Sequence, residues 1–518
     1  MLKRTVISAL FTMTALVGPA MAADCDIVIL GGRVMDPETN FDDVRNVCVK
    51  ADRIAAITQE DISGTETIDA SGHVVAPGFI NTHTHTYLPF DQRMMARDGT
   101  TTILDTEMGS GSVAAFYDNL KGDMLLNYGI SVGHEPIRTV VLDGVPLDDA
   151  KDPSYAPHWR GAAEAEDGHG SWAFDVPTPE QNAEMFALFE QGLKEGAIGV
   201  GSTVGYMSHG TPTQEIFDLQ ILAKKYDRIF GAHTRFGPGE RLPTDYSLGV
   251  REIIANAVAI DGALILSHIQ NHWGTGWTEP YELARALQAR GMTIFAEYYP
   301  SGMGNPNIST PQLKQELWEA NGIDIATQII DPTTGEFFTE EEFLREQAEN
   351  PSKLVFGLIS PAENLYDWVH MKDVAIANDM LAFFLPSGEV PPVDTAFEEY
   401  RGHPRNAGTY GTVFRVAREE GIPLMDIVNN ASYIPAKYFS QLGLKPMQER
   451  GRMQEGMIAD ITIFNPETFT EHATMKLGEQ GLPSTGVPYV LVSGKILVRD
   501  SKVDLDMRSG QPIRYPVN

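Results

Sequence analysis

Strand-like apolar runs alternate with helix-like runs along the middle of the chain, and this alternation limits the fold more than any other feature. The strand-like runs cover residues 74–85, 99–109, 196–206, 229–237, 263–270, 293–302 and 381–389. Helical patterns lie between several of them, at 178–195, 214–226, 281–290 and 425–442. Repeated strand–helix units in one long chain are typical of a parallel sheet covered by helices. We therefore predict an α/β fold based on a parallel (β/α)8 barrel, or TIM barrel.

The two chain ends have a different sequence pattern. Residues 25–75 and the runs GMIADITIFNP and VPYVLVSGKILV near the far end read as short strands separated by turns. We expect 23–76 and 441–518 to form one small β-sandwich domain, with the barrel spanning 77–440. The stretch at about 305–379 is polar, acidic and helix-rich, and we interpret it as an insertion or lid.

The charge balance excludes some partners. The 518 residues include 39 basic and 70 acidic side chains, which gives a formal net charge of −31. Such a charge argues against general electrostatic binding of nucleic acid or of an anionic membrane. We expect a small-molecule substrate, and the sequence does not indicate an oligomeric state.

The first 22 residues resemble a secretory signal peptide. Lys3 and Arg4 precede an apolar run at 5–18, and Ala20-Met21-Ala22 supplies a small-x-small cleavage pattern. The run is too short to span a bilayer, and no other segment reaches about 18 uninterrupted apolar residues. We expect a periplasmic or secreted protein. In such an oxidising compartment the two cysteines, Cys25 and Cys48, can pair, although two free thiols remain an alternative.

Four of the 13 histidines stand where strand-like runs end. His83 and His85 close the first run, and alternate residues of a strand share a face. His233 and His268 close two later runs. Catalytic residues of parallel barrels lie at the carboxyl ends of the strands, and imidazoles gathered there suit divalent ions such as zinc. We predict a site for one or two such ions.

Several of these runs resemble one enzyme superfamily. VVAPGFINTHTH (74–85) is similar to the first-strand signature of the amidohydrolases, and GMIADITIF (456–464) with VLVSGKIL (490–497) is similar to their closing β-domain pattern. More narrowly, the chain resembles the N-acyl-D-amino-acid deacylase, or D-aminoacylase, branch. The matching stretches include SVGHEPIR (131–138), GYMSHGTPTQE (205–215), GAHTRFG (231–237), LSHIQ (266–270), AEYYPSG (296–302) and HPR (403–405).

The resemblance implies a metal-bearing barrel with a β-sandwich made from both chain ends. It also implies that His83 and His85 hold the more exposed metal, and that His233 and His268 hold the tighter one. In that branch a cysteine completes the tight site, and its position falls here on Met108. A thioether is a poor substitute for a bridging thiolate on zinc. The adjacent Glu107 is the candidate bridging ligand if the strand end is shifted by one residue; an ordinary loop interaction is the alternative.

The resemblance also implies a catalytic aspartate at the end of the last barrel strand. Aligning that strand with LAFFLPSGE (381–389) places Ser387 at the position of the aspartate. A serine hydroxyl is not a general base near neutral pH without an activator, so we consider Glu389 as a stand-in and a solvent-exposed loop acid as its alternative role. Asp379 precedes this run and is expected to face the opposite end of the barrel.

Three further residues are candidates for contact with substrate. Tyr206 stands where the family has a substrate-holding tyrosine, and it could also stabilise an oxyanion. Arg235, two residues after His233, could pair with a carboxylate, although a structural role is equally expected. Gln270 replaces a common family lysine, which weakens the usual carboxylate anchor. His134 lies in a well-matched stretch, and we expect it to serve packing.

The leading hypothesis is an exported, metal-dependent hydrolase of a small amide. One alternative keeps the metal barrel but changes the substrate to a lactone or cyclic imide, or the reaction to a non-hydrolytic one. Another is a barrel that binds metal without catalysis, motivated by the missing cysteine and aspartate.

Overall fold

A computed structural model describes residues 25–164, 170–236, 248–270, 278–310, 313–318, 323–351, 353–358, 364–385 and 387–517. The predicted leader therefore lies outside the described residues. No helix within the described ranges is long and apolar enough to cross a membrane.

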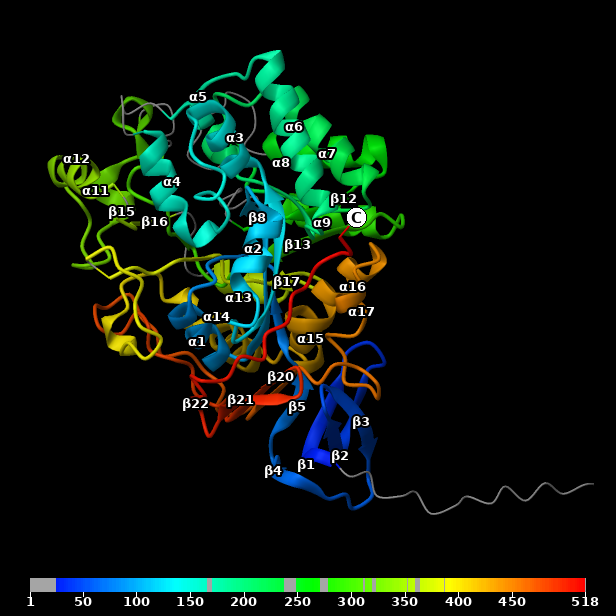
Figure 1. Cartoon of the computed structure of the whole chain (residues 1–518). Coiled ribbons are helices and arrows are strands. Elements are labelled where there is room, and N and C mark those ends of the chain that lie inside the picture. The colour runs from blue at the N-terminus through cyan, green and yellow to red at the C-terminus, as the bar shows by residue number, and fades with distance from the viewer. Residues whose placement is uncertain are drawn as a thin grey trace, which may run out of the picture.

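Strands from both chain ends form a single sheet at one pole of the molecule (Figure 1). The N-terminal strands are β1 (Cys25–Asp36), β2 (Phe41–Lys50), β3 (Arg53–Thr58), β4 (Gly64–Asp69) and β5 (Val74–Pro77). The C-terminal strands are β19 (Ile461–Phe464), β20 (Tyr489–Val492), β21 (Lys495–Arg499) and β22 (Lys502–Val503). β5 joins the two sets, because it pairs parallel with β1 and antiparallel with β19.

Cys25 and Cys48 form a disulfide between β1 and β2, with 5.5 Å between their Cα atoms. The open choice between a disulfide and two free thiols is thereby decided in favour of the bond. Both half-cystines are fully buried beside Val28.

Eight parallel strands form a nearly closed barrel, as predicted. In chain order they are β6 (Phe79–Asn81), β8 (Thr100–Ser110), β9 (Asn127–Gly133), β10 (Gly199–Ser202), β11 (Ile229–Ala232), β12 (Ala263–Leu266), β13 (Ile294–Tyr298) and β17 (Ala375–Ile376). The first and last strands meet where Asn81 Nδ2 donates to Asn378 Oδ1 at 2.8 Å. Just beyond them, β7 (Thr84–His85) pairs parallel with β18 (Met380–Leu381).

The last barrel strand differs from the prediction. The run at 381–389 is not a barrel strand; only its first residue belongs to a strand, the two-residue β18. The true last strand, β17, pairs with β13 and lies six residues earlier in the chain. Because β17 falls inside the range predicted as an insertion, that range extends too far along the chain.

Helices cover the barrel and close the end at which its strands begin. They are α1 (Pro89–Arg97), α2 (Val113–Leu120), α3 (His134–Asp143), α4 (Ala156–Ala163), α5 (Ser171–Phe174), α6 (Pro179–Lys194), α7 (Thr213–Lys225), α8 (Leu248–Ile260), α9 (Thr278–Gln288), α13 (Asn364–Val369), α14 (Arg405–Glu420), α15 (Leu424–Val428), α16 (Ile434–Gln441) and α17 (Lys445–Gln448). From α16, Tyr438 stacks on Phe295 of β13 with ring centres 4.7 Å apart. This contact plugs the amino-terminal end of the barrel, so the opposite end remains for chemistry.

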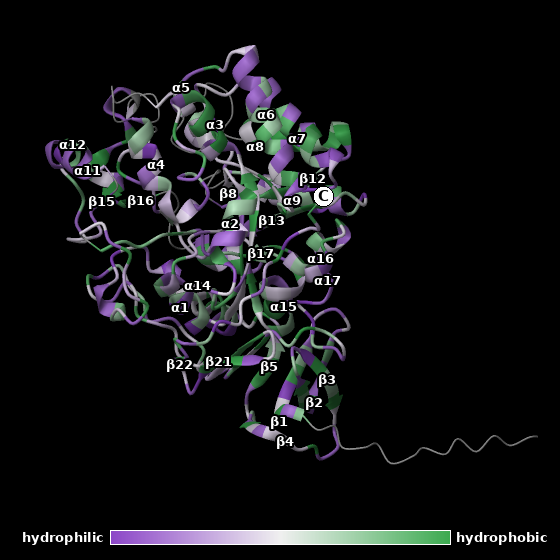
Figure 2. Ribbon diagram, viewed as in Figure 1, coloured by the Kyte–Doolittle hydropathy of each residue, from purple (hydrophilic) through white to green (hydrophobic). Residues whose placement is uncertain are grey.

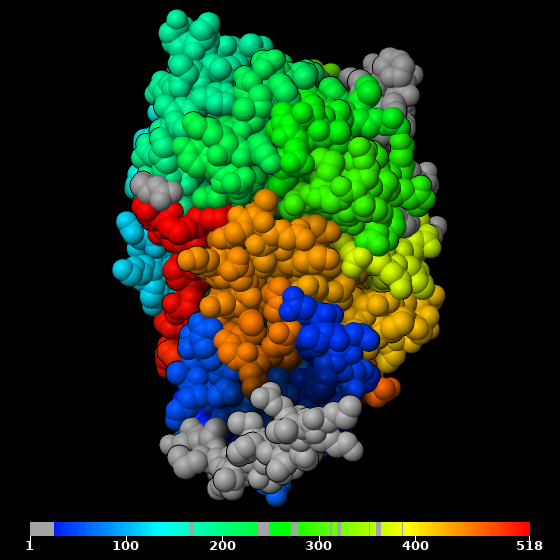
Figure 3. Space-filling view, turned by 90° about the vertical axis from the view of Figure 1, so that its right-hand side faces the viewer, coloured from blue at the N-terminus to red at the C-terminus, as the bar shows by residue number. Residues whose placement is uncertain are grey.

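The C-terminal segment after the sheet returns to the barrel. The amide of Ile513 donates to the Tyr128 carbonyl at 2.6 Å, and that of Tyr515 donates to the Gly196 carbonyl at 3.0 Å. Figure 3 shows this red segment passing beside the orange region that separates the barrel helices from the blue N-terminal strands.

An inserted unit with its own small core follows β13. It contains β14 (Met303–Gly304), β15 (Ile329–Ile330), β16 (Phe356–Leu358), α11 (Ile325–Gln328) and α12 (Glu340–Glu349). Ile308 and Phe343 are fully buried in this core, against which Trp318 packs. The outlying α12 is mostly hydrophilic, whereas hydrophobic residues gather in the strands nearer the centre (Figure 2).

Candidate metal centre

His83 and His85 lie side by side at the carboxyl end of the first barrel strand. Their Nε2 atoms are 3.0 Å apart, and both rings are buried. The spacing of two residues places both on one face of the chain, as the sequence pattern predicts.

A bulge in β8 directs Glu107 toward these histidines. The pairing of β8 with β9 shifts register between Asp105 and Ser110, and Asp105 Oδ1 accepts hydrogen bonds from the amides of Glu107 and Met108. Gly109 then takes a positive φ of 73°, and a Cβ there would lie 2.7 Å from the Cα of Gly133. Bulges of this kind redirect side chains beside active sites.

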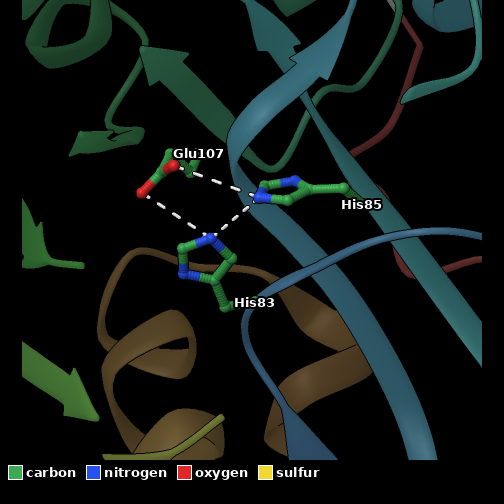
Figure 4. A group of neighbouring side chains, drawn as sticks. All are labelled: His83, His85 and Glu107. Carbon is green, nitrogen blue, oxygen red and sulfur yellow. Dashed lines mark hydrogen bonds and ion pairs between the residues drawn. The ribbon is translucent and has the colours of Figure 1, made fainter. Parts of the chain in front are cut away.

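Glu107 consequently occupies the position expected of a bridging ligand. Its Oε2 lies 3.6 Å from His83 Nε2, and its Oε1 lies 4.0 Å from His85 Nε2 (Figure 4). Met108 is buried against Trp159 in a separate apolar cluster, although it borders the cavity described below. The shift by one residue that the sequence left open is therefore present.

His233 and His268 approach Glu107 from the other side. They follow β11 and β12, and His233 Nδ1 lies 3.1 Å from His268 Nε2. Glu107 Oε1 is 3.5 Å from His233 Nδ1, and Glu107 Oε2 is 3.0 Å from His268 Nε2. All four predicted histidines and Glu107 thus converge on one point.

Two buried carboxylates orient the first pair of histidines. Glu297 of β13 bonds His83 Nδ1, and Asp105 Oδ2 lies 3.0 Å from His85 Nδ1. Holding Nδ1 in this way leaves Nε2 of each ring directed at the centre, which is the usual second layer of a histidine metal site. No pattern in the sequence marks either carboxylate.

Asp379 lies in the site, and the expectation that it faces the opposite end of the barrel is wrong. Its Oδ1 lies 3.5 Å from the Nε2 atoms of both His83 and His85, and its amide donates to the His83 carbonyl at 2.9 Å. The error follows from the misplaced last strand, because Asp379 comes just after β17 and not before a barrel strand.

Arg405 holds the other side of the Asp379 carboxylate. One guanidinium nitrogen lies 2.9 Å from Asp379 Oδ2, and the guanidinium sits 3.8 Å above the Tyr299 ring. Burial raises the pKa of Asp379, but the charges of Arg405 and His83 outweigh burial and hold that pKa well below its usual range. The HPR motif at 403–405 was noted in the sequence without a role for its arginine.

The electrostatics of the cluster fit a bound cation. Burial lowers the pKa of His83, but Glu107, Glu297 and Asp379 more than reverse this and raise it to about 9. Glu107 Oε2 is buried, and it faces ring nitrogens of two histidines, 3.0 Å from His268 Nε2 and 3.6 Å from His83 Nε2. A divalent ion held among these groups would supply the positive charge that the clustered carboxylates require.

The donor atoms form overlapping groups. Three sets each bring their ligand atoms within 4.8 Å of one another, and Glu107 belongs to two of them. The sets are His83–His85–Glu107, Glu107–His233–His268 and His83–His268–Asp379. Nitrogen and carboxylate donors suit zinc, so the predicted centre for one or two divalent ions is confirmed, with Glu107 placed to bridge.

The predicted catalytic stand-ins lie elsewhere. Ser387 and Glu389 are both exposed, and Ser387 Oγ donates to Glu389 Oε2 at 3.1 Å. Neither borders the metal cavity. Their interaction is that of an ordinary surface turn, and Asp379 occupies the position that they were expected to fill.

The predicted substrate residues separate into two groups. Tyr206 borders the metal cavity and stacks on His233 with ring centres 4.6 Å apart. Arg235 instead forms a forked ion pair with Glu252, and Gln270 is buried with its Nε2 donating to the Tyr299 carbonyl. Neither of these two borders the cavity. His134 bonds Ser202 and Glu215 in the interior, which is the packing role expected of it.

A cavity of about 190 Å³ opens above the metal ligands. Its walls include Arg160, Arg405 and, from the inserted unit, Asn305 and Asn307. Arg160 is held by a forked pair with Glu135, at 2.6 and 2.8 Å. The inserted unit therefore contributes to the wall of the metal cavity.

Comparison with known proteins gives a consistent result. An N-acyl-D-glutamate deacylase of Alcaligenes xylosoxydans xylosoxydans is 25% identical over 503 residues, which cover 92% of this chain and 94% of that protein. A D-aminoacylase of the same organism is 26% identical over 512 residues, covering 90% and 93%. The chain resembles the D-aminoacylase branch of the amidohydrolases.

The fold comparison agrees with this resemblance. The crystal structure of an N-acyl-D-glutamate deacylase from Bordetella bronchiseptica, complexed with zinc and a phosphonate inhibitor, superposes with a TM-score of 0.73. It is 21% identical and covers 95% of this chain and 100% of its own. No family model matches the chain.

Proposed function

We propose that the protein is a metal-dependent amidohydrolase that cleaves the amide bond of small N-acyl amino acids. The observation that carries the proposal is the position of Glu107, whose carboxylate oxygens lie within 4.0 Å of a ring nitrogen of each of the four histidines. The carboxylate of Asp379 lies beside two of the same histidines, His83 and His85. The similarity to full-length deacylases supports this substrate class.

His83, His85, Glu107, His233 and His268 would hold the metal. Zinc bound there would act as a Lewis acid and lower the pKa of a water molecule toward neutrality. The remaining steps belong to the side chains of this protein.

Asp379 is the proposed proton carrier. Its Oδ1 faces the centre while Oδ2 is held by Arg405, so the carboxylate is fixed in one orientation. It would accept the proton of the attacking water at Oδ1 and return it to the nitrogen of the leaving amine. A positioned acid–base group of this kind contributes about 10²- to 10⁴-fold in rate.

Three groups on the cavity wall would position the substrate. Tyr206, half-buried beside His233, can donate a hydrogen bond from its hydroxyl to the developing oxyanion. Burial and the nearby Glu107 raise the pKa of Tyr206, so the hydroxyl keeps its proton. Arg405 and Arg160 also border the cavity; because each already pairs with a carboxylate of the protein, Asp379 and Glu135 respectively, only their remaining N–H groups are available to a substrate carboxylate.

We further propose that the protein is exported to the periplasm or secreted. The leader-like pattern at 1–22 and the disulfide between Cys25 and Cys48 support an oxidising destination. Fractionation of cells and N-terminal sequencing of the mature protein test this proposal, which fails if the protein stays in the cytoplasm with residues 1–22 intact.

The activity is tested with zinc-loaded protein and paired N-acetyl-D- and N-acetyl-L-amino acids, followed by release of free amine. We expect turnover that is abolished by a chelator and restored by zinc. A matched panel of lactones and cyclic imides addresses the alternative reactions. Turnover of that panel without release of amine from any N-acyl amino acid would overturn the proposal.

A further inference from the structure

A second cavity adjoins the metal cavity and has no role in the chemistry described so far. Its volume is about 370 Å³. It shares two wall residues, Asn307 and Leu381, with the metal cavity, and Leu381 lies two residues after Asp379. The two cavities therefore share part of their wall, and a substrate with its scissile bond near Asp379 would lie beside the second one.

The walls of this second cavity are mainly apolar. They come from residues 153–158, from the inserted unit and from the segment that follows β18, and they include Ala156, Pro157, Leu354, Phe383, Phe384 and Leu385. Phe384 packs edge-on against His158 with ring centres 5.2 Å apart. Cavities of this size and lining bind apolar or aromatic groups.

Glu346, Lys353 and Arg401 are the charged side chains at this wall, and Arg401 donates hydrogen bonds to the carbonyls of Glu398 and Tyr400. Lys353 lies at the wall, and its Nζ is 2.7 Å from Asp331 Oδ2 and 3.1 Å from Glu346 Oε2. Because both contacts are made within the protein, Lys353 does not favour an anionic ligand.

The wall segment is fixed to the barrel rather than merely lying over it. The Phe383 amide donates to Asp91 Oδ2 of α1 at 3.2 Å, and the Leu385 amide donates to the Glu389 carbonyl at 2.9 Å. Arg93 of α1 donates to the carbonyls of Val393 and Thr395. A preformed wall of this kind lowers the entropic cost of binding.

We propose that the second cavity binds an aryl or medium-length alkyl group of the substrate, joined by a short linker to the scissile amide. The proposal rests on the proposed function and specifies its substrate class. The same apolar chemistry can come from the acyl group or from the amino-acid side chain, and the experiment separates these two sources.

Binding of three ligands is measured by calorimetry on the zinc-loaded Asp379→Asn protein, so that the amide persists. N-acetylglycine is the reference, N-phenylacetylglycine carries the aryl group on the acyl side, and N-acetyl-D-phenylalanine carries it on the amine side. We expect one aryl ligand to bind at least about tenfold more tightly than the reference, with a more negative heat-capacity change.

Phe384→Ala and Phe384→Arg, made in the same background, test the location. Both should remove the aryl preference and leave the affinity for N-acetylglycine within about twofold. Phe337→Ala is the matched control, because Phe337 lies in the inserted unit, is 45% exposed and does not border either cavity. It should keep the preference.

Equal affinity for all three ligands in the Asp379→Asn protein would overturn the proposal even if the Phe384 variants failed to fold. An aryl preference that survives both Phe384 substitutions would overturn it too. Failure of the proposed function is a separate result: the wild-type protein would release no amine, while the Phe384-dependent aryl preference would still stand.

Discussion

The metal cavity and the second cavity are adjacent, yet they are made in different ways. The metal ligands stand at the ends of barrel strands. All of them except His233, which is 22% exposed, are almost completely buried, and the outer contacts of His83 and His85 are other buried side chains. The second cavity is walled by loops, a short helix and the inserted unit. Barrel strand ends hold catalytic groups in fixed geometry, whereas loops vary without disturbing the scaffold. The residues proposed for the reaction and those proposed for substrate selection therefore belong to different parts of the fold.

The largest expected effect concerns Glu107. Glu107→Gln keeps the shape but removes the charge that both metal-ligand groups share, so we expect at least a 10³-fold fall in kcat/KM, of the order seen when a key electrostatic group is lost. Elemental analysis should show less bound zinc. Met108→Leu, at the next position, is the matched control and should keep both metal and activity. Full zinc content and activity in Glu107→Gln would break the contrast between the two cavities.

Asp379→Asn should lower kcat by about 10²- to 10⁴-fold, because the amide cannot carry the proton. Zinc content should remain close to that of the wild type, which separates this role from that of Glu107. Ser387→Ala and Glu389→Gln, at the exposed turn, should leave kcat unchanged. A large loss of kcat in Glu389→Gln would return the catalytic role to the residue first considered from the sequence.

The smallest effect concerns stability at the link between α1 and the wall of the second cavity. Burial raises the pKa of Asp91 to about 7. A carboxyl group with a raised pKa in the folded state contributes stability below its unfolded pKa of 3.8, and that contribution is lost as the pH rises through about 7. The shift of about three units corresponds to at most about 4 kcal/mol.

Asp91→Asn should therefore flatten the fall in unfolding free energy between pH 4 and 8, measured by urea denaturation. Activity on N-acetyl substrates should change little. An unchanged pH profile would show that Asp91 does not carry the proton in the folded protein.

Sequence patterns predicted the metal ligands well because each histidine ends a clear apolar run. The same reasoning failed for Asp379. Its strand, β17, is only two residues long, whereas the more apolar run from Leu381 to Leu385 looks like a better strand. That run is apolar because it walls a cavity, and periodicity cannot distinguish this reason from membership of a barrel.

Glu107 illustrates a second limit. Its role depends on a bulge that is fixed by Asp105 and by the positive φ of Gly109, and neither leaves a periodic signal. The contacts of Glu297 with His83 and of Asp105 with His85 were also not predicted, because they join residues 214 and 20 positions apart, beyond the range of a local sequence pattern. The barrel could be predicted from the alternation of strand-like and helix-like runs, and the pairing of strands from both chain ends could be predicted from their turn-rich pattern and from the family resemblance.

The pairing of β5 with β19 also affects how the chain is made. These strands are far apart in the sequence, so the edge of β5 has no partner from β19 until the whole barrel between them has been synthesised. Contacts between such distant segments are slow to form. The protein should therefore complete this sheet only after β19 has been synthesised, and a chain that stops before β19 would expose that edge to other molecules.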